Sequence, residues 1–303
     1  MYAPIALFVY NRPIHTRQTI DALKKNELAC ESDLVIFSDA SKNSESCIAV
    51  NEVRDYLKSV TGFKSVSIIE REKNLGLANS VIEGVSKLCK ERGNIIVLED
   101  DLITSPFFLD YMNSALVRFQ DCERVMQISG YMFPVTLNVD TDAFFLPMTT
   151  SWGWATWHRA WQHIDLTAKG YEALKNDANL RNKFNIDSSY NYFRLLEWQL
   201  NRKVNSWAVL WYLSVFMRDG LVLFPKQSLV ENIGFDGSGT HGAAMSLINS
   251  ILLTSKVINF PTIEIDNSAK NLISNYLRNQ FPKPFLERLI DCMNTKFIKI
   301  FKI

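Results

Sequence analysis

Short apolar segments and amphipathic segments alternate through the first third of the chain, and this alternation limits the folds that the chain can adopt. Four β-prone runs have the length of strands: residues 5–10, 33–38, 65–69 and 95–98. The segments between them have the apolar spacing of helices: residues 16–25, 51–60 and 75–90. This order is typical of βαβ units. We therefore expect an α/β fold with a central, mostly parallel sheet flanked by helices.

Polar side chains follow three of these predicted strands. Asn11 and Arg12 follow the first strand, Asp39 follows the second, and Glu-Asp-Asp at residues 99–101 follows the fourth without a spacer. Ligands of parallel sheets bind at the carboxyl ends of the strands, so we expect these side chains to form one site. The alternative is that they are ordinary polar strand ends.

The three adjacent carboxylates of Glu99, Asp100 and Asp101 need a counter-charge, because like charges repel and lose hydration at the end of a buried strand. In an extended strand Asp100 would point away from the other two, whereas a turn just past the strand can bring all three towards one cavity. Mn²⁺ and Mg²⁺ take oxygen ligands and need few protein carboxylates when substrate phosphates supply the rest. The run therefore predicts a site for Mn²⁺ or Mg²⁺ beside a diphosphate, where the ion would offset charge on the leaving group.

The order of strand, Asn-Arg-Pro, helix, strand with a terminal Asp, and apolar strand ending in Glu-Asp-Asp resembles the nucleotide-sugar-binding half of GT-A glycosyltransferases. It is most similar to the branch around N-acetylglucosaminyltransferase I, over residues 3 to about 160. Further on, SWGWATWHRAW, NSW and SLVENIGFDGSGTHG resemble bacterial sugar transferases that build surface polysaccharides. The resemblance implies one catalytic domain on a GT-A (Rossmann-like) sheet, with a helical, aromatic-rich second half. We expect a nucleotide-sugar-binding half (1–130), an acceptor-binding half (131–260) and a C-terminal helical tail (261–303).

The resemblance also implies roles for single residues. Asp101 would bind the metal directly, and these residues would hold the nucleotide sugar: Asn11, Arg12, Asp39, Asn74, Asn79, Glu99 and Asp100. Among them, Arg12 would pair with a diphosphate oxygen and Asp39 would accept a hydrogen bond from the base. Glu99 and Asp100 would bond the donor sugar or the ribose.

Two segments of the second half are candidates for sugar contacts. In Trp152-Gly153-Trp154 the glycine would let backbone approach a ligand while the indoles stack on sugar rings, with core packing as the alternative. Residues 232–242 contain four glycines, which suits a loop that closes over a ligand. In this loop Asp236 is a candidate sugar contact and His241 a candidate metal ligand or phosphate contact, whereas a surface turn is the alternative.

The catalytic base is not apparent from the sequence. An inverting transferase needs an Asp or Glu to deprotonate the acceptor hydroxyl. In the N-acetylglucosaminyltransferase I branch this is an Asp just before a Trp, whereas residues 205–207 read Asn-Ser-Trp here. Glu197 and Glu231 are the candidates to replace it. We expect inversion, with retention of configuration or a different alignment of the second half as alternatives.

Composition excludes several other classes of protein. Lys and Arg number 33 against 32 Asp and Glu, so we expect no nucleic-acid partner. Five cysteines without CxxC spacing argue against a disulfide framework or a zinc site and indicate a reducing compartment. No run of about 18 uncharged apolar residues occurs, so a spanning helix is not expected and the predicted location is the cytoplasm.

The last nineteen residues, FLERLIDCMNTKFIKIFKI, combine apolar residues with Lys296, Lys299 and Lys302. As a helix, this stretch would be basic and amphipathic and could lie on the inner face of the cell membrane, close to a lipid-linked acceptor. A terminal helix packed on the domain is the alternative.

Together these features predict a metal-dependent glycosyltransferase. It would move a hexosyl or N-acetylhexosaminyl group from a nucleoside diphosphate, expected to be UDP, to a saccharide acceptor in bacterial surface polysaccharide or lipopolysaccharide synthesis. One alternative is a catalytically inactive homologue that still binds a sugar nucleotide. Another is a metal-dependent nucleotidyltransferase, against which stands the absence of a Gly-rich phosphate loop after the first strand and of a Walker-type lysine.

Overall fold

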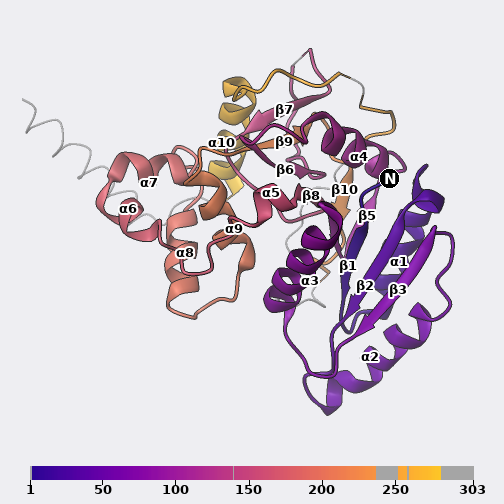
Figure 1. Ribbon diagram of the computed structural model, residues 1–303. Coiled ribbons are helices and arrows are strands. Elements are labelled where there is room, and N and C mark those ends of the chain that lie inside the picture. Colours follow the sequence, from indigo (N-terminus) through magenta and orange to yellow (C-terminus); the bar gives the residue numbers. More distant parts are fainter. Residues whose placement is uncertain (1, 139, 237–251, 258, 281–303) are drawn as a thin grey trace, which may run out of the picture.

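An eight-stranded sheet organises the chain (Figure 1). The computed structural model describes residues 2–138, 140–236, 252–257 and 259–280. In spatial order the strands are β3 (Ser65–Glu70), β2 (Asp33–Ser38), β1 (Ile5–Val9), β4 (Asn94–Glu99), β8 (Trp154–Trp157), β6 (Val125–Ser129), β9 (Leu221–Pro225) and β7 (Ala143–Leu146). Within the described residues, β8 and β7 run against the other six strands. The expected α/β fold with a mostly parallel sheet is confirmed.

Strands β1, β2 and β4 are buried because helices cover each face of the sheet, whereas the edge strand β3 is exposed or half-buried along its length. In β1, Ile5, Leu7 and Val9 pack into one core, whereas Ala6 and Phe8 pack into the other. Every residue of β1 is buried. The continuous apolar run of this strand is therefore explained by burial on both faces of the sheet, as its pattern predicted.

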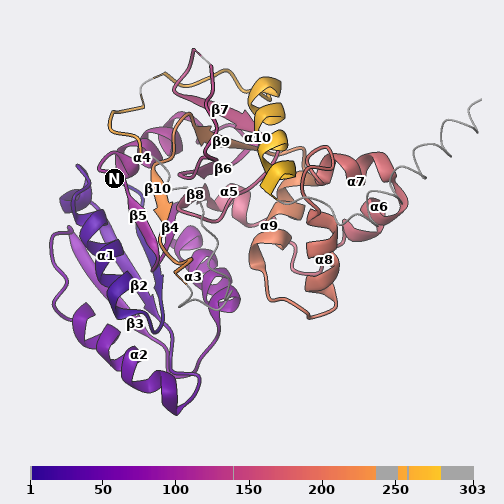
Figure 2. The same ribbon diagram turned by 180° about the vertical axis from the view of Figure 1, so that it is seen from behind.

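Helices from both halves of the chain cover the sheet (Figure 2). On one face lie η1 (Ala29–Glu31), α1 (Pro13–Lys24), α2 (Ser44–Leu57) and α4 (Phe108–Arg118). The other face carries α3 (Leu77–Arg92), α5 (His158–Trp161), α9 (Trp207–Phe216) and α10 (Asn267–Gln280). The short helices α6 (Tyr171–Asn176), α7 (Ala178–Phe184) and α8 (Tyr192–Leu200) group on the side of the molecule away from β3.

The boundaries of α1 and α2 follow local sequence signals. Pro13 stands at the start of α1, as the sequence predicted. The helix predicted over residues 51–60 instead begins at Ser44 and ends at Leu57. A reciprocal capping box between Asn43 and Ser46 fixes this earlier start, since each side chain bonds the other residue's backbone N–H.

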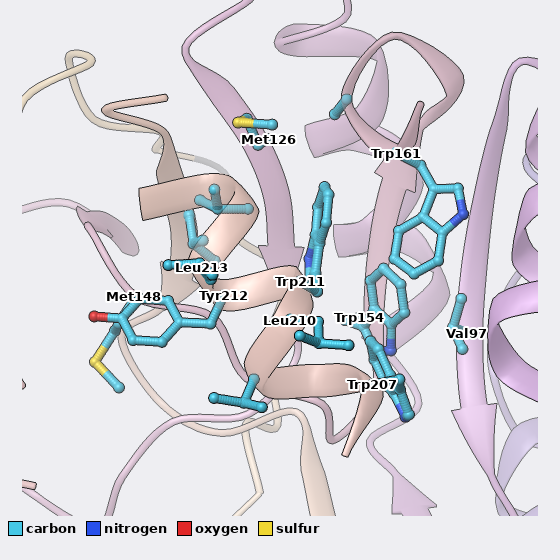
Figure 3. Packing of buried hydrophobic residues seen from close by; sticks show 14 of the residues in the cluster. Val97, Met126, Met148, Trp154, Trp161, Trp207, Leu210, Trp211, Tyr212 and Leu213 are labelled. Atoms are coloured by element: carbon cyan, nitrogen blue, oxygen red, sulfur yellow. The ribbon is translucent and has the colours of Figure 1, made fainter. Parts of the chain in front are cut away.

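A core of indole rings lies between α9 and the sheet (Figure 3). Trp154 stacks on Trp207 at a centroid distance of 5.2 Å and lies 5.6 Å from Trp161. Trp154 is fully buried, so it presents no face on which a sugar could stack. The prediction that Trp154 contacts a sugar is wrong, and core packing, its alternative, is what the structure has.

Gly153 also serves packing inside the protein. Its φ of +59° is a conformation that L side chains rarely adopt, and a Cβ there would lie 2.7 Å from Cγ1 of Val230. Its carbonyl accepts a hydrogen bond of 2.7 Å from the N–H of Gly130. Gly153 is buried among protein atoms, so the prediction that it lets backbone approach a ligand is wrong.

The part of the expected C-terminal tail that the structure describes belongs to the main core. Ala269, Ile273 and Leu277 of α10 are buried in the same cluster as α9. Residues 285–303, with the predicted basic helix, lie outside the described residues. No described helix combines the length and the apolar composition needed to cross a bilayer.

Candidate functional site

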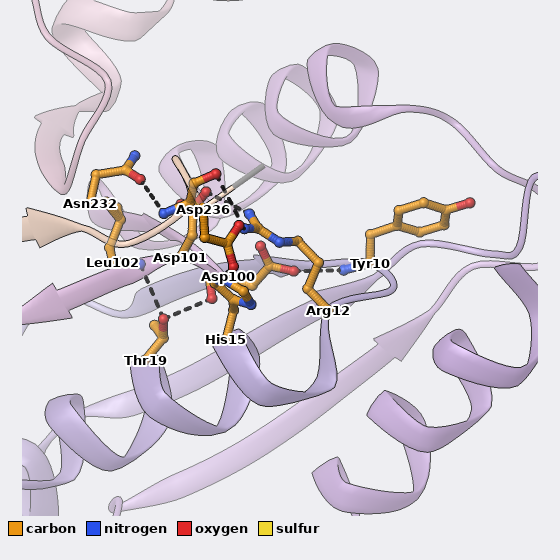
Figure 4. A network of polar contacts seen from close by, with 10 residues as sticks. Tyr10, Arg12, His15, Thr19, Asp100, Asp101, Leu102, Asn232 and Asp236 are labelled. Atoms are coloured by element: carbon orange, nitrogen blue, oxygen red, sulfur yellow. Dashed lines mark hydrogen bonds and ion pairs between the residues drawn. The ribbon is translucent and has the colours of Figure 1, made fainter. Parts of the chain in front are cut away.

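The predicted strand ends meet because β1 and β4 are parallel neighbours, with Phe8 opposite Glu99 (Figure 4). Arg12, just after β1, donates from Nη1 to Oδ2 of Asp101 at 2.9 Å. From the other side, Asp236 lies 3.5 Å from Nη2 of Arg12 and 3.1 Å from Nε2 of His15. The protein's own counter-charge for the carboxylates is therefore Arg12, which is drawn into a network with both Asp101 and Asp236.

A turn starts as soon as β4 ends, so the alternation of a strand does not apply to the carboxylates. Oδ2 of Asp100 accepts from the backbone N–H of Tyr10 at 3.2 Å. Oγ1 of Thr19 donates to the Asp100 carbonyl at 2.9 Å and accepts from the N–H of Leu102 at 3.1 Å. Thr19 is fully buried in α1 and fixes this turn. Sequence reasoning missed Thr19, although a threonine on the apolar face of the predicted helix is a signal that could have found it.

The carboxylates resist ionisation. Burial raises the pKa of Glu99 to about 8, and the charges of Asp101 and Asp100 add to the rise. Burial and the charge of Asp101 raise the pKa of Asp100 to about 7. Burial also raises the pKa of Asp101, although Arg12 acts in the opposite direction. One guanidinium therefore does not balance the three acids, and a further positive charge would favour their ionised forms.

The donor set fits a hard divalent cation that takes most of its ligands from elsewhere. Oδ1 of Asp101 is buried without a hydrogen-bond partner, so its lone pairs are available. In the part of the chain that the structure describes, no group of three or more His, Cys, Asp or Glu side chains is arranged to hold a metal. Asp101 fits an ion such as Mn²⁺ that is completed by phosphate oxygens and water. The other predicted ligand, His241, lies outside the described residues.

The short strand β10 (Val230–Asn232) covers this turn, because it pairs with β5 (Leu102–Thr104) in a separate two-stranded sheet. The N–H of Ile233 donates to the Asp101 carbonyl at 2.9 Å. A Cβ on Gly234 would collide with the Asp101 carboxylate, so only glycine lets the segment lie this close. The segment that leads into the predicted glycine loop is therefore built onto the carboxylate turn.

Asp39 organises the neighbouring loop. Its Oδ1 accepts from the N–H of Leu75 and its Oδ2 from the N–H of Gly76, both at 2.9 Å. The side-chain amide of Asn74 donates to the Ala40 carbonyl at 2.7 Å. These contacts join the end of β2 to the start of α3. The bond from Asp39 to a base stays a prediction, since a carboxylate has lone pairs beyond those used here.

The remaining predicted donor contacts lie around the same strand ends. Asn11 is half-buried in the turn between β1 and α1, next to Arg12. Asn79 is exposed in the first turn of α3, where its amide donates to the Leu75 carbonyl at 2.9 Å. Asn79 thus braces the loop that Asp39 holds.

Of the two candidate bases, only Glu231 lies near the carboxylates. Glu231 is in β10, opposite Ile103 and next to the segment that bonds Asp101. Glu197 is in α8, where the hydroxyl of Tyr171 approaches it at 3.4 Å. Both views of the fold show α8 apart from β10 (Figures 1 and 2). Glu231 is therefore the nearer of the two to the carboxylate turn, and the role of either residue as the base stays a prediction.

Trp152 lies between the carboxylate network and a second feature, a cavity of about 320 Å³ in the other half of the chain. Its ring is 5.5 Å from that of Phe235, which precedes Asp236. On its other side the ring of Tyr131, which lines the cavity, is 4.5 Å away. Trp152 is half-buried and lines the cavity itself, unlike Trp154.

No protein-family model and no curated protein sequence matches the chain. Solved structures do. The mannosyltransferase PcManGT from Pyrobaculum calidifontis, in complex with GDP-Man and Mn²⁺, has 13% identity and a TM-score of 0.34 over 52% of this chain and 45% of its own. TarS of S. aureus, residues 1–349, has 11% identity and a TM-score of 0.40 over 75% and 59%. Mouse xyloside xylosyltransferase 1 has 11% identity and a TM-score of 0.36 over 72% and 82%. The chain thus spans less than two thirds of the first two of these structures.

Proposed function

We propose that the chain is a metal-dependent glycosyltransferase of the GT-A type that uses a nucleoside diphosphate sugar. The observation that carries the proposal is the pairing of Arg12 with Asp101 at the carboxyl ends of β1 and β4. A cation and a carboxylate with one unbonded oxygen meet there, where parallel sheets bind ligands. Arg12 suits a diphosphate, and the carboxylate of Asp101 suits a divalent ion.

Each residue would have a task in donor binding. A divalent ion bound at Asp101 would offset the negative charge that develops on the leaving diphosphate. Arg12, released from Asp101, would pair with a diphosphate oxygen. Glu99 and Asp100 would bond hydroxyls of the donor sugar or the ribose, and Asp39 would accept from the base. Glu231 is our candidate for the base that deprotonates the acceptor hydroxyl.

The decisive experiment is a calorimetric titration of UDP, GDP and other nucleoside diphosphates with and without Mn²⁺. Asp101→Asn should abolish metal-dependent binding. Asp33→Asn is a matched control, because Asp33 is also partly buried and ion-paired. It lies at the start of β2, away from the carboxyl ends of the strands. Binding that is indifferent to both Mn²⁺ and Asp101→Asn would refute the donor site.

Turnover separates a transferase from its alternatives. With a nucleotide sugar and no acceptor, a transferase releases free sugar and nucleoside diphosphate by slow transfer to water. An inactive homologue would bind the donor and release nothing, and a nucleotidyltransferase would release pyrophosphate from a nucleoside triphosphate. The panel of donors would also test our proposals of UDP as the nucleotide and of a hexosyl or N-acetylhexosaminyl group. NMR of the product's anomeric configuration tests inversion.

We further propose a cytoplasmic role in bacterial surface polysaccharide synthesis on a lipid-linked acceptor. The basic C-terminal stretch supports it, because Lys296, Lys299 and Lys302 would face an anionic bilayer if the stretch is helical. Deletion of residues 285–303 should weaken binding to anionic liposomes, and unchanged binding would reject the membrane contact.

A further inference from the structure

The cavity next to Trp152 has a wall of four aromatic rings in contact. The ring of Trp152 is 4.5 Å from Tyr131, Tyr131 is 5.2 Å from Phe133, and Phe133 is 6.0 Å from Tyr276 of α10. All four line the cavity. Such a wall offers several flat apolar faces to a ligand, with hydroxyl groups at two of its rings.

A second wall comes from the segment just before α8, from the start of α8 and from α9. Tyr190 and Tyr192 lie 4.6 Å apart, and Tyr192 lies 4.9 Å from Tyr212. The hydroxyl of Tyr212 donates to the Phe184 carbonyl at 2.8 Å, which fixes this ring in the core. The two walls line one cavity, which we call the tyrosine pocket.

The tyrosines of the two walls are close enough to influence one another. Burial raises the pKa of Tyr131, and Tyr276 raises it further. Burial also raises the pKa of Tyr192, with smaller contributions from Tyr190 and from Tyr131 across the pocket. These hydroxyls therefore stay protonated at neutral pH, so each is able to donate and to accept a hydrogen bond.

The described residues that line the tyrosine pocket include no Lys, Arg, His, Asp or Glu. Its other polar groups are neutral, among them Ser206 and Gln280. A carboxylate or phosphate placed here would lose its hydration without meeting a cation, which is costly. A sugar ring suits the lining, because its C–H face packs on aromatic rings while its hydroxyls bond tyrosine hydroxyls.

The tyrosine pocket adjoins the candidate donor site. Trp152 contacts Tyr131 of the pocket on one side and Phe235 on the other. Phe235 is next in the chain to Asp236, which faces Arg12. A ligand in the pocket would therefore lie beside the network that includes Asp101.

We propose that the tyrosine pocket binds a neutral pyranose of the acceptor and excludes a uronic acid or another anionic sugar at this position. Sugars with an N-acetyl group fit best, since its methyl can pack on the largely aromatic and aliphatic lining while its amide bonds the neutral polar groups. The inference rests on the proposed function, to which it adds the chemical class of the acceptor.

A matched pair of ligands tests it: methyl β-glucopyranoside and methyl β-glucuronide, which differ only in the charge and oxidation state at C6. Their binding to the full chain is measured by saturation-transfer NMR, with and without UDP and Mn²⁺. We expect the glucoside to bind about tenfold more tightly, or by roughly 1.4 kcal/mol, because the carboxylate of the glucuronide would leave water without meeting a cation. Methyl N-acetyl-β-glucosaminide should bind at least as well as the glucoside.

Variants assign the binding to the pocket. Ala208→Phe in α9 adds volume to the lining and should remove glycoside binding. Tyr276→Phe deletes only a hydroxyl and should weaken binding by a few fold. Tyr56→Phe is the control, because Tyr56 lies in α2 on the other face of the sheet and should change nothing.

The results for donor and acceptor can be told apart. Equal binding of glucoside and glucuronide, glucoside binding that survives Ala208→Phe, or no glycoside binding at all would each overturn the inference. Nucleotide titration of the same samples reports on the proposed donor site separately. If nucleotides bind and glycosides do not, the pocket assignment fails alone, whereas glycoside binding without nucleotide binding refutes the donor site.

Discussion

Nη1 of Arg12 lies 2.9 Å from Oδ2 of Asp101, a contact between residues 89 positions apart in the chain. The side chains of both are largely buried, at 14% and 17% exposure. The contact exists because β1 and β4 are adjacent and parallel, so that the residues after each strand emerge at the same edge. Among the salt bridges that the structure describes, Arg12 is the one cationic partner of Asp101.

Removal of Arg12 should lower the free energy of unfolding, because the acidic turn loses its cationic partner. Arg12→Ala leaves Asp101 without its partner beside two other acids, and we expect the free energy of unfolding to fall by about 1–3 kcal/mol at pH 8. The double variant Arg12→Ala/Asp101→Asn should recover most of the loss, because it also removes the charge. Urea denaturation of the two single variants and the double variant measures the coupling.

Arg124→Ala provides the comparison for Arg12→Ala. Arg124 pairs with Asp219 at 3.0 Å, but Asp219 is 82% exposed, so we expect a change below about 0.5 kcal/mol. If the effects of Arg12→Ala and Asp101→Asn simply add in the double variant, the two residues do not depend on each other in the way described.

The stability of the metal-free protein should fall as pH rises. Glu99 and Asp100 have folded-state pKa values of about 8 and about 7, above the usual value near 4 for a free carboxyl. The folded state therefore holds protons that the unfolded state has lost. Their contribution is complete below about pH 4 and is lost as the pH passes through 7 and 8. Denaturation at pH 5, 6.5 and 8 measures the slope.

Two comparisons assign this slope to the carboxylates. Glu99→Gln should make it shallower, since glutamine does not titrate and only the contribution of Asp100 remains. Millimolar Mn²⁺ should raise the melting temperature at pH 8 in the native chain but not in Asp101→Asn. A native chain and a Glu99→Gln variant with the same pH dependence would contradict the assignment.

Two glycines should respond differently to the same substitution. In Gly234→Ala the new Cβ would fall on the Asp101 carboxylate and close to Arg12, in a segment that is only partly buried. We expect a loss of nucleotide and Mn²⁺ affinity of about tenfold, or roughly 1.4 kcal/mol, with little change in stability. Calorimetry and thermal melting of one sample separate the two quantities.

Gly153→Ala should do the reverse. Its positive φ and the Val230 side chain oppose a Cβ in the core, so we expect about 1–3 kcal/mol of destabilisation. Nucleotide binding by the remaining folded protein should be near native. A Gly153→Ala variant of native stability would contradict this prediction, because it would mean that the surrounding core shifts to accept the added Cβ.

The two indoles beside Gly153 should also separate stability from binding. Trp154→Ala removes a fully buried ring that stacks on Trp207, and we expect a loss of about 3–5 kcal/mol. Trp152→Ala removes a half-buried ring at the cavity and should cost less stability, while weakening glycoside binding. Equal melting temperatures for the two variants would contradict these different environments.

The sequence was most informative where structure depends on local pattern. The segment DLVIFS was predicted as a strand over residues 33–38, and β2 has those bounds. The Glu-Asp-Asp run was predicted at the carboxyl end of a buried strand, and β4 ends at Glu99. Both follow from a continuous apolar run with a polar end, which a strand covered on both faces imposes.

Trp152-Gly153-Trp154 shows the limit of such patterns. Residues two apart share a face only while the strand continues, but β8 starts at Trp154 and Gly153 has a positive φ. Trp152 therefore turns to the cavity while Trp154 enters the core. The tyrosines of the pocket have no common spacing in the sequence, since they come from the segments after β6 and before α8 and from α8, α9 and α10.

The sequence by itself thus determined the α/β order of the first half and the position of three acids at one strand end, because both are set by neighbours in the chain. Only the tertiary structure decided that Arg12 balances Asp101, that Glu231 is near them while Glu197 is not, and which aromatic rings face a cavity. Those relationships depend on which strands are adjacent and on how distant helices pack, and a single stretch of sequence contains neither.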